Sequence, residues 1–181
     1  MRRIILAMAL VGVAVPAALV VDPAVAALPI GRAAPDFRTM GALNGKPFRL
    51  HLAEQLKNGP VVLYFYPKAY TKGCTLEARA FSEANPSFVA AGARVIGLSA
   101  DDLPTLKRFS VEHCRGQFPV ATASAKIIRD YDVKLPVVGM SNRTSFVIAR
   151  DGRIVFVHSD LDWKDHVAKT LAAVRALQPQ G

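Results

Sequence analysis

The pattern of apolar and polar positions predicts strands and helices in alternation along the chain. An apolar run from Val61 to Tyr66, rich in β-branched and aromatic residues, predicts a buried strand. Pro67 ends this strand, because proline has no N–H to donate to a sheet ladder. A second strand is predicted from Arg94 to Ser99, and a hairpin from the runs Thr144 to Ala149 and Arg153 to His158.

A helical pattern follows the first strand and begins at Cys74. Pro86 is predicted to interrupt this helix, with Asn85 capping a second piece that Gly92 ends. Four more helices are predicted along the chain, from Leu52 to Lys57, from Asp101 or Asp102 to about Cys114, from Ser124 to Tyr131 and from Trp163 to Leu177.

The order of these elements predicts an α/β fold. Asn44-Gly45 is a strong turn signal and predicts an N-terminal β-hairpin within residues 36–52. A strand–helix–strand unit then precedes a second hairpin and a closing helix. This order is typical of a thioredoxin-like fold, with a mixed central sheet flanked by helices.

Composition and charge narrow the class of protein. The chain has 181 residues, of which 51% are hydrophobic and 20% charged, so we expect one globular domain with a possible extension. The net charge is +9, but the basic residues are scattered singly and are not interleaved with aromatic residues. We therefore do not expect nucleic-acid binding.

The N-terminus has the pattern of an export signal. Arg2 and Arg3 precede an uncharged apolar run that reaches Val21, and an Ala-x-Ala site follows at Ala24 to Ala26. We expect a signal peptide over residues 1–26, cleavage after Ala26, and a mature domain over residues 27–181. The mature protein is then exported, with the periplasm as the expected compartment, and has no membrane segment. The alternative is an uncleaved N-terminal anchor.

Cys74 is the strongest candidate for chemistry. A cysteine at a helix N-terminus meets the positive end of the helix dipole and unpaired backbone N–H groups, which favour the thiolate. Such a thiol is better suited to react than to pack. The alternative is an inert core thiol, because free cysteines are often buried.

The segment PKAYTKGC, from Pro67 to Cys74, resembles the active-site motif of the peroxiredoxins, P-x-x-x-T-x-x-C. The longer stretch FYPKAYTKGCTLEA is similar to the peroxiredoxin Q branch, also called the bacterioferritin comigratory protein group. The resemblance extends from APDF at Ala34 to the segment NRTSFVIARDGRIV and the closing helix. It implies a thiol peroxidase without metal, haem or flavin, in which Cys74 attacks the peroxide. Thr71 and Arg143 would position and polarise the peroxide, while Pro67 shields the site.

The resemblance departs from the branch at two positions near Cys74. Many members carry a second cysteine where this chain has Arg79, and usually a proline where it has Lys72. Cys114 resembles the other arrangement of the branch, with the resolving cysteine on the helix after the second strand. It would attack sulfenylated Cys74 to form an intramolecular disulfide. A permanent structural disulfide and an idle Cys114 in a one-cysteine enzyme remain open.

Glu77, one helical turn after Cys74, has two possible roles. It can cap the helix start, or it can orient an arginine as the family's glutamate does at this position.

The resemblance also implies partners, which are a peroxide substrate and a thioredoxin-like or other dithiol reductant. We expect a monomer or a weak dimer. The four histidines have no ligand spacing with each other or with the cysteines, so we expect no metal. Two other classes remain, an extracytoplasmic thiol-disulfide exchange protein and a non-catalytic thioredoxin-like binding module. The chain has no C-x-x-C motif, which argues against the first.

Overall fold

The computed structural model describes residues 27–136 and 139–178, so the predicted signal segment lies outside the described residues. Seven strands form one mixed sheet in the order β2-β1-β5-β4-β3-β6-β7. The strands are β1 (Arg38–Leu43), β2 (Lys46–His51), β3 (Val61–Phe65), β4 (Arg94–Ser99), β5 (Val120–Thr122), β6 (Thr144–Ile148) and β7 (Ile154–Ser159). The helices are α1 (Leu52–Leu56), α2 (Lys72–Ala90), α3 (Leu103–Glu112), α4 (Ala125–Asp130) and α5 (His166–Ala176).

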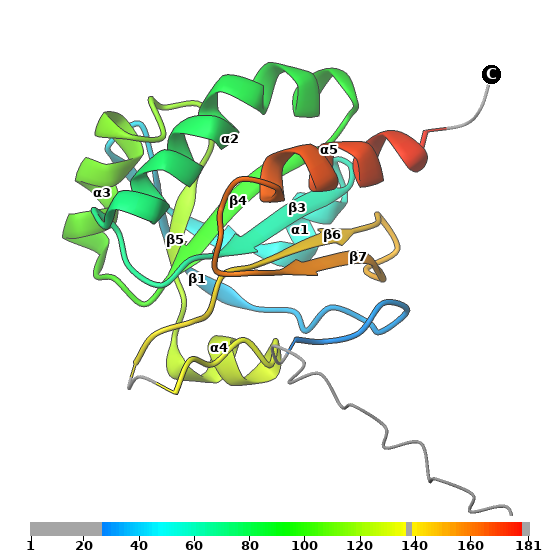
Figure 1. Cartoon of the computed structure of the whole chain (residues 1–181), viewed down its shortest axis with the longest axis horizontal. Coiled ribbons are helices and arrows are strands. Elements are labelled where there is room, and N and C mark those ends of the chain that lie inside the picture. Colours follow the sequence, from blue (N-terminus) through cyan, green and yellow to red (C-terminus); the bar gives the residue numbers. More distant parts are fainter. Residues whose placement is uncertain (1–26, 137–138, 179–181) are drawn as a thin grey trace, which may run out of the picture.

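Helices cover both faces of the sheet, as the thioredoxin-like prediction requires. Helices α2 and α5 lie together over one face, with α3 beside α2, and α4 lies on the opposite side (Figure 1). The N-terminal hairpin is confirmed, since β1 pairs antiparallel with β2 around Asn44 and Gly45. Both turn residues have positive φ, as an Asn-Gly hairpin turn requires. The α/β fold class predicted from the sequence is confirmed.

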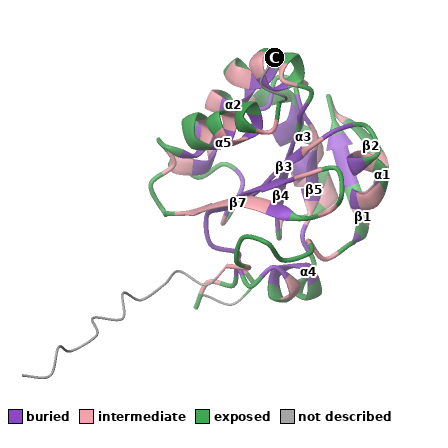
Figure 2. Ribbon diagram, turned by 90° about the vertical axis from the view of Figure 1, so that its right-hand side faces the viewer, coloured by how far each residue is buried: buried purple, intermediate pink, exposed green. Residues whose placement is uncertain are grey.

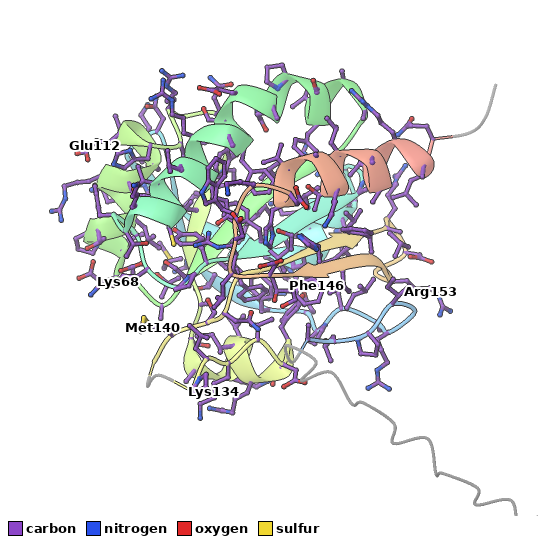
Figure 3. The ribbon with its side chains drawn as sticks, viewed as in Figure 1. Lys68, Glu112, Lys134, Met140, Phe146 and Arg153 are labelled. Carbon is purple, nitrogen blue, oxygen red and sulfur yellow. The ribbon has the colours of Figure 1, made fainter. Side chains whose placement is uncertain are left out.

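The core has two layers, one on each face of the sheet. Buried residues concentrate on the central strands between the helices, while the outer faces of the helices are exposed (Figure 2). Phe146 lies in the middle of the molecule against Phe65, whereas Lys68 and Arg153 project outward (Figure 3). The fully buried run over β3 explains its unbroken apolar sequence, because a central strand meets protein on both faces.

The sheet brings two distant segments together at one end. Strand β3 runs parallel to β4 and antiparallel to β6, with Phe65 opposite Thr144. The end of β3 therefore meets the start of β6. The loop that carries Pro67 and the residue before β6, Arg143, emerge side by side.

One detail of the predicted helices is wrong. Helix α2 continues through Pro86, and Asn85 does not cap a second piece, because its amide donates to the Gln117 carbonyl at 2.9 Å. An internal proline removes a helical hydrogen bond at a cost of about 3 kcal/mol. Phe81 and Phe88 are fully buried on either side of it, and this packing favours one continuous helix. Helix α3 ends at Glu112, so Cys114 lies just beyond it.

The predicted signal peptide, residues 1–26, is not part of the described fold. Within residues 27–136 and 139–178, we find no helix that is both long enough and apolar enough to cross a membrane.

Candidate active site

Cys74 lies in the first turn of α2, at the N-terminus of the helix. Thr71 is the N-cap residue, and its carbonyl accepts the first helical hydrogen bond from Thr75 N–H at 2.9 Å. Cys74 lies in this first turn and is 1% exposed. The N–H groups of this turn have no carbonyl one turn earlier, and they carry the positive end of the helix dipole. An anion at this position is therefore stabilised.

Arg143 reaches Cys74 from the start of β6. Its Nη2 donates to Cys74 Sγ at 3.5 Å, and its Nη1 donates to a carboxylate oxygen of Glu77. Its Nε donates to the Leu161 carbonyl at 2.9 Å, which fixes the plane of the guanidinium. Although burial alone would lower the pKa of Arg143, the charges of Glu77 and Cys74 raise it. The guanidinium stays charged where it meets the sulfur.

The approach of Arg143 depends on a glycine in the first turn of α2. A Cβ atom at Gly73 would lie 3.1 Å from Arg143 Nη2 and 3.8 Å from Trp163 Cδ1. The absence of a side chain at Gly73 leaves room for the guanidinium, and Trp163 packs against the same spot.

The loop between β3 and α2 is held by Asp101, which follows β4. The Asp101 carboxylate accepts from Ala69 N–H at 2.7 Å and from the Ser99 hydroxyl at 2.8 Å. Thr71 donates its hydroxyl to the Lys68 carbonyl at 2.9 Å rather than to the sulfur. Pro67 is half-buried at the start of this loop.

Glu77 lies one turn after Cys74 on α2 and meets Arg143. It is fully buried and pairs with Arg143 instead of capping the helix start. Burial raises the pKa of Glu77 to about 8, although the charge of Arg143 and its hydrogen bond act in the opposite direction. Glu77 therefore orients Arg143 from the side away from Cys74.

The second cysteine has a different environment. Cys114 follows α3, is fully buried, and donates its N–H to the Phe109 carbonyl at 3.1 Å. Burial raises the pKa of the Cys114 thiol well above its usual value. Both cysteines are free thiols, and they belong to the same hydrophobic cluster under α2 and α3.

Several residues that hold the site were not identified from the sequence. Asp101 clamps the loop, the Ser141 hydroxyl donates to the Tyr66 carbonyl at 3.0 Å, and the Leu161 carbonyl orients Arg143. A backbone carbonyl has no sequence signal, and a lone Ser or Asp has only a weak one. Among the described residues, no group of three or more His, Cys, Asp or Glu side chains is arranged to hold a metal ion.

Comparison with known proteins identifies the family. The sequence profile of the AhpC/TSA family matches residues 30–157. The chain belongs to the AhpC/TSA family. It is a peroxiredoxin, a thiol peroxidase of that family.

Named relatives and a solved structure agree with this assignment. Chloroplastic peroxiredoxin Q of Arabidopsis thaliana is 34% identical over 148 residues, which cover 81% of this chain and 67% of the relative. Chloroplastic peroxiredoxin Q of Oryza sativa subsp. japonica is 30% identical over 149 residues, with the same coverage. The crystal structure of Peroxidoxin BcpB from Mycobacterium tuberculosis superposes with a TM-score of 0.72 at 33% identity, covering 82% of this chain and 97% of that chain.

We expect Arg143→Lys to slow the reaction of Cys74 with iodoacetamide at pH 7 by about tenfold, the equivalent of one charge-assisted hydrogen bond of about 1.5 kcal/mol. A lysine ammonium cannot reproduce the fork that serves Cys74 and Glu77 together. Mass spectrometry assigns the alkylated cysteine. Arg79→Lys, an exposed arginine on α2 paired with Glu83, is the control and should react at the wild-type rate. Equal rates for both variants would contradict this role of Arg143.

Proposed function

We propose that this peroxiredoxin reduces hydrogen peroxide and organic hydroperoxides through a sulfenic acid on Cys74, which Cys114 then converts to an intramolecular disulfide. The observation that carries the proposal is the hydrogen bond from Arg143 Nη2 to Cys74 Sγ at 3.5 Å, made at a helix N-terminus. A fixed cation and unpaired N–H groups around one sulfur suit a reaction in which negative charge moves from sulfur to oxygen.

In the first step the Cys74 thiolate attacks one oxygen of the peroxide. The O–O bond breaks, the sulfur is oxidised to sulfenic acid, and the other oxygen leaves as an alcohol or water after taking up a proton. Arg143 can stabilise the negative charge as it moves from the sulfur to the leaving oxygen. Its Nη2 already lies beside the sulfur, and its other contacts hold it in place. The N–H groups at the start of α2 add further positive potential.

Thr71 enters this step as an acceptor. The Thr71 hydroxyl donates its proton to the Lys68 carbonyl. Its oxygen can therefore only accept a hydrogen bond from any other group. A hydroperoxide O–H can donate to that oxygen while its O–O bond points toward Cys74. Pro67, beside the loop, limits access of further oxidant to the sulfenic acid.

In the second step the Cys114 sulfur attacks the sulfur of Cys74, releasing water and forming the disulfide. Burial holds Cys114 as a neutral thiol in the closed structure, so the end of α3 must open before this thiol can act. A dithiol of the thioredoxin type then reduces the disulfide by exchange.

Contacts between the two cysteine-bearing segments support this route. The Tyr70 ring, just before Thr71, lies edge-on to Phe109 and to His113, with centroids 5.4 Å and 5.3 Å away. Tyr70 and Arg115, the residue after Cys114, both have left-handed backbone conformations, with φ of 64° and 52°. Such conformations cost about 1–2 kcal/mol for residues with side chains. Opening of either segment releases this strain.

Export is a further part of the proposal. The signal pattern over residues 1–26 supports secretion followed by cleavage after Ala26, which would place the enzyme in the periplasm. There it would meet oxidants outside the cytoplasm and require a reductant of that compartment.

Cys74→Ser should lower peroxide consumption by more than about 1,000-fold, since removal of an essential nucleophile has at least that effect. Consumption of hydrogen peroxide and of an alkyl hydroperoxide is measured with dithiothreitol as reductant. The matched control is Ser87→Ala, an isolated change further along α2. A Cys74→Ser protein with wild-type activity would rule out the proposed mechanism.

Cys114→Ser should leave the first turnover intact and leave the sulfenic acid of Cys74 available to dimedone, because only the second step needs this thiol. Mass spectrometry after one equivalent of peroxide should show the Cys74–Cys114 disulfide in the wild type and the dimedone adduct in the variant. An unchanged steady-state rate with a thioredoxin-type reductant would make this a one-cysteine enzyme.

A gene that encodes residues 1–181 should yield an exported protein that begins at Ala27, because the Ala-x-Ala site ends at Ala26. The intact mass of protein from the periplasmic fraction tests this. Recovery of the uncleaved chain from the membrane fraction would instead support the N-terminal anchor.

A further inference from the structure

A second polar cluster lies behind the site, on the side of Glu77 that faces away from Cys74. Glu77, Ser145 and His166 are fully buried there, and Arg143 is 5% exposed. One carboxylate oxygen of Glu77 accepts from Arg143, but the other, Oε1, has no hydrogen-bond partner among the described residues. His166 Nδ1 lies 3.8 Å from this oxygen. A buried carboxylate oxygen without a partner is costly and needs an explanation.

The contacts of His166 show which ring nitrogen carries a proton. Nε2 is 2.9 Å from the Asp160 carbonyl, which can only accept, so Nε2 carries a proton. Nδ1 is 2.8 Å from the Ser145 hydroxyl and also faces Glu77 Oε1. With a neutral ring, the lone pair of Nδ1 accepts from the Ser145 hydroxyl, so this nitrogen offers no proton to Glu77 and an ionised Oε1 stays without a partner. One additional proton, on Oε1 or on Nδ1, makes this contact attractive.

The surrounding charges favour the same additional proton. Other titratable or charged groups near the pair come from β3, α2, the residue before β6, β7, the loop after β7 and α5: Tyr64, Cys74, Arg143, His158, Asp160, Asp165 and Lys169. The His158 ring lies 4.5 Å from that of His166. With Cys74 as a thiolate, an ionised Glu77 gives the buried group with Arg143 a net negative charge. One proton on the pair makes it neutral, and unbalanced buried charge costs several kcal/mol.

The pKa directions agree with this geometry. Burial raises the pKa of Glu77 to about 8 and lowers that of His166 to about 4. Between these values the pair holds one proton beyond the one on Nε2.

We propose that His166 is a positioning residue for peroxide reduction, which shares one proton with Glu77 and so keeps Arg143 directed at Cys74. The inference rests on the proposed function and extends it to a residue that does not touch the substrate. When the shared proton is lost, Glu77 becomes a full anion against Arg143. It then competes with the Cys74 sulfur for the guanidinium, and the reaction with peroxide slows.

The test is the pH profile of the first turnover. The chain has one tryptophan, Trp163, which lies beside Gly73 in the turn that carries Cys74, so its fluorescence can report oxidation of Cys74 in a stopped-flow experiment. We expect the wild-type rate constant to fall above a pH of about 8. Glu77→Gln, whose neutral amide imitates the protonated carboxyl, should lose this fall.

Two substitutions at His166 separate positioning from packing. His166→Leu should slow the first turnover at pH 7 by about 10- to 100-fold and shift the alkaline fall, since small displacements of positioned groups have effects of this size. His166→Asn, whose amide can replace Nδ1, should restore most of the rate. His158→Leu removes the neighbouring ring and should retain the wild-type alkaline fall. Loss of that fall in both leucine variants, or no rescue by asparagine, would overturn the proposal.

A spectroscopic readout tests the shared proton without activity. Nitrogen-15 NMR detects an imidazolium at His166, and infrared difference spectra against Glu77→Gln detect a protonated carboxylic acid. One of the two signals should be present at pH 7 and titrate near pH 8. Absence of both at pH 7 would overturn the proposal even in an active enzyme. An inactive wild type that shows the signal would refute the proposed function alone.

Discussion

The fork of Arg143 between Cys74 and Glu77 is the interaction on which the rest of the site depends. A buried guanidinium is tolerated only when its charge is balanced and its N–H groups are used. Arg143 meets both conditions through the Cys74 sulfur, the Glu77 carboxylate and the Leu161 carbonyl. The sheet makes this possible, because the pairing of β3 with β6 places Arg143 next to the loop that leads into α2.

The fold gives its two cysteines opposite environments, although both are buried. The Cys74 sulfur meets a permanent cation and the start of a helix, which stabilise negative charge. Cys114 lies among apolar side chains, and burial raises the pKa of its thiol. This difference sets the order of the chemistry under the proposed function. Peroxide reacts first with Cys74, whose negative charge is stabilised. Cys114 becomes a nucleophile only after the segment that carries it opens.

The sequence predicted the architecture well, because alternating patterns and the Asn-Gly turn are local signals that the sheet preserves. It also pointed to Cys74, Thr71 and Arg143, and the structure brings Cys74, Arg143 and Glu77 into contact. It failed where tertiary packing outweighs local preference, as at Pro86, which the buried side chains around it hold within α2. His166 carried no signal either. A lone histidine in an amphipathic helix is ordinary, and only the buried partner on α2 gives it meaning.

The continuity of α2 also changes where the protein can open. Pro86 lies near the far end of this helix and does not weaken the turn that holds Cys74. That turn is held instead by Arg143, by the bond from Ala69 to Asp101, and by the contacts of Tyr70 with α3. On the proposed cycle, oxidation replaces a sulfur anion by a neutral sulfenic acid. The electrostatic attraction between Arg143 and the Cys74 sulfur is then lost. The reaction itself therefore loosens the segment that must move toward Cys114.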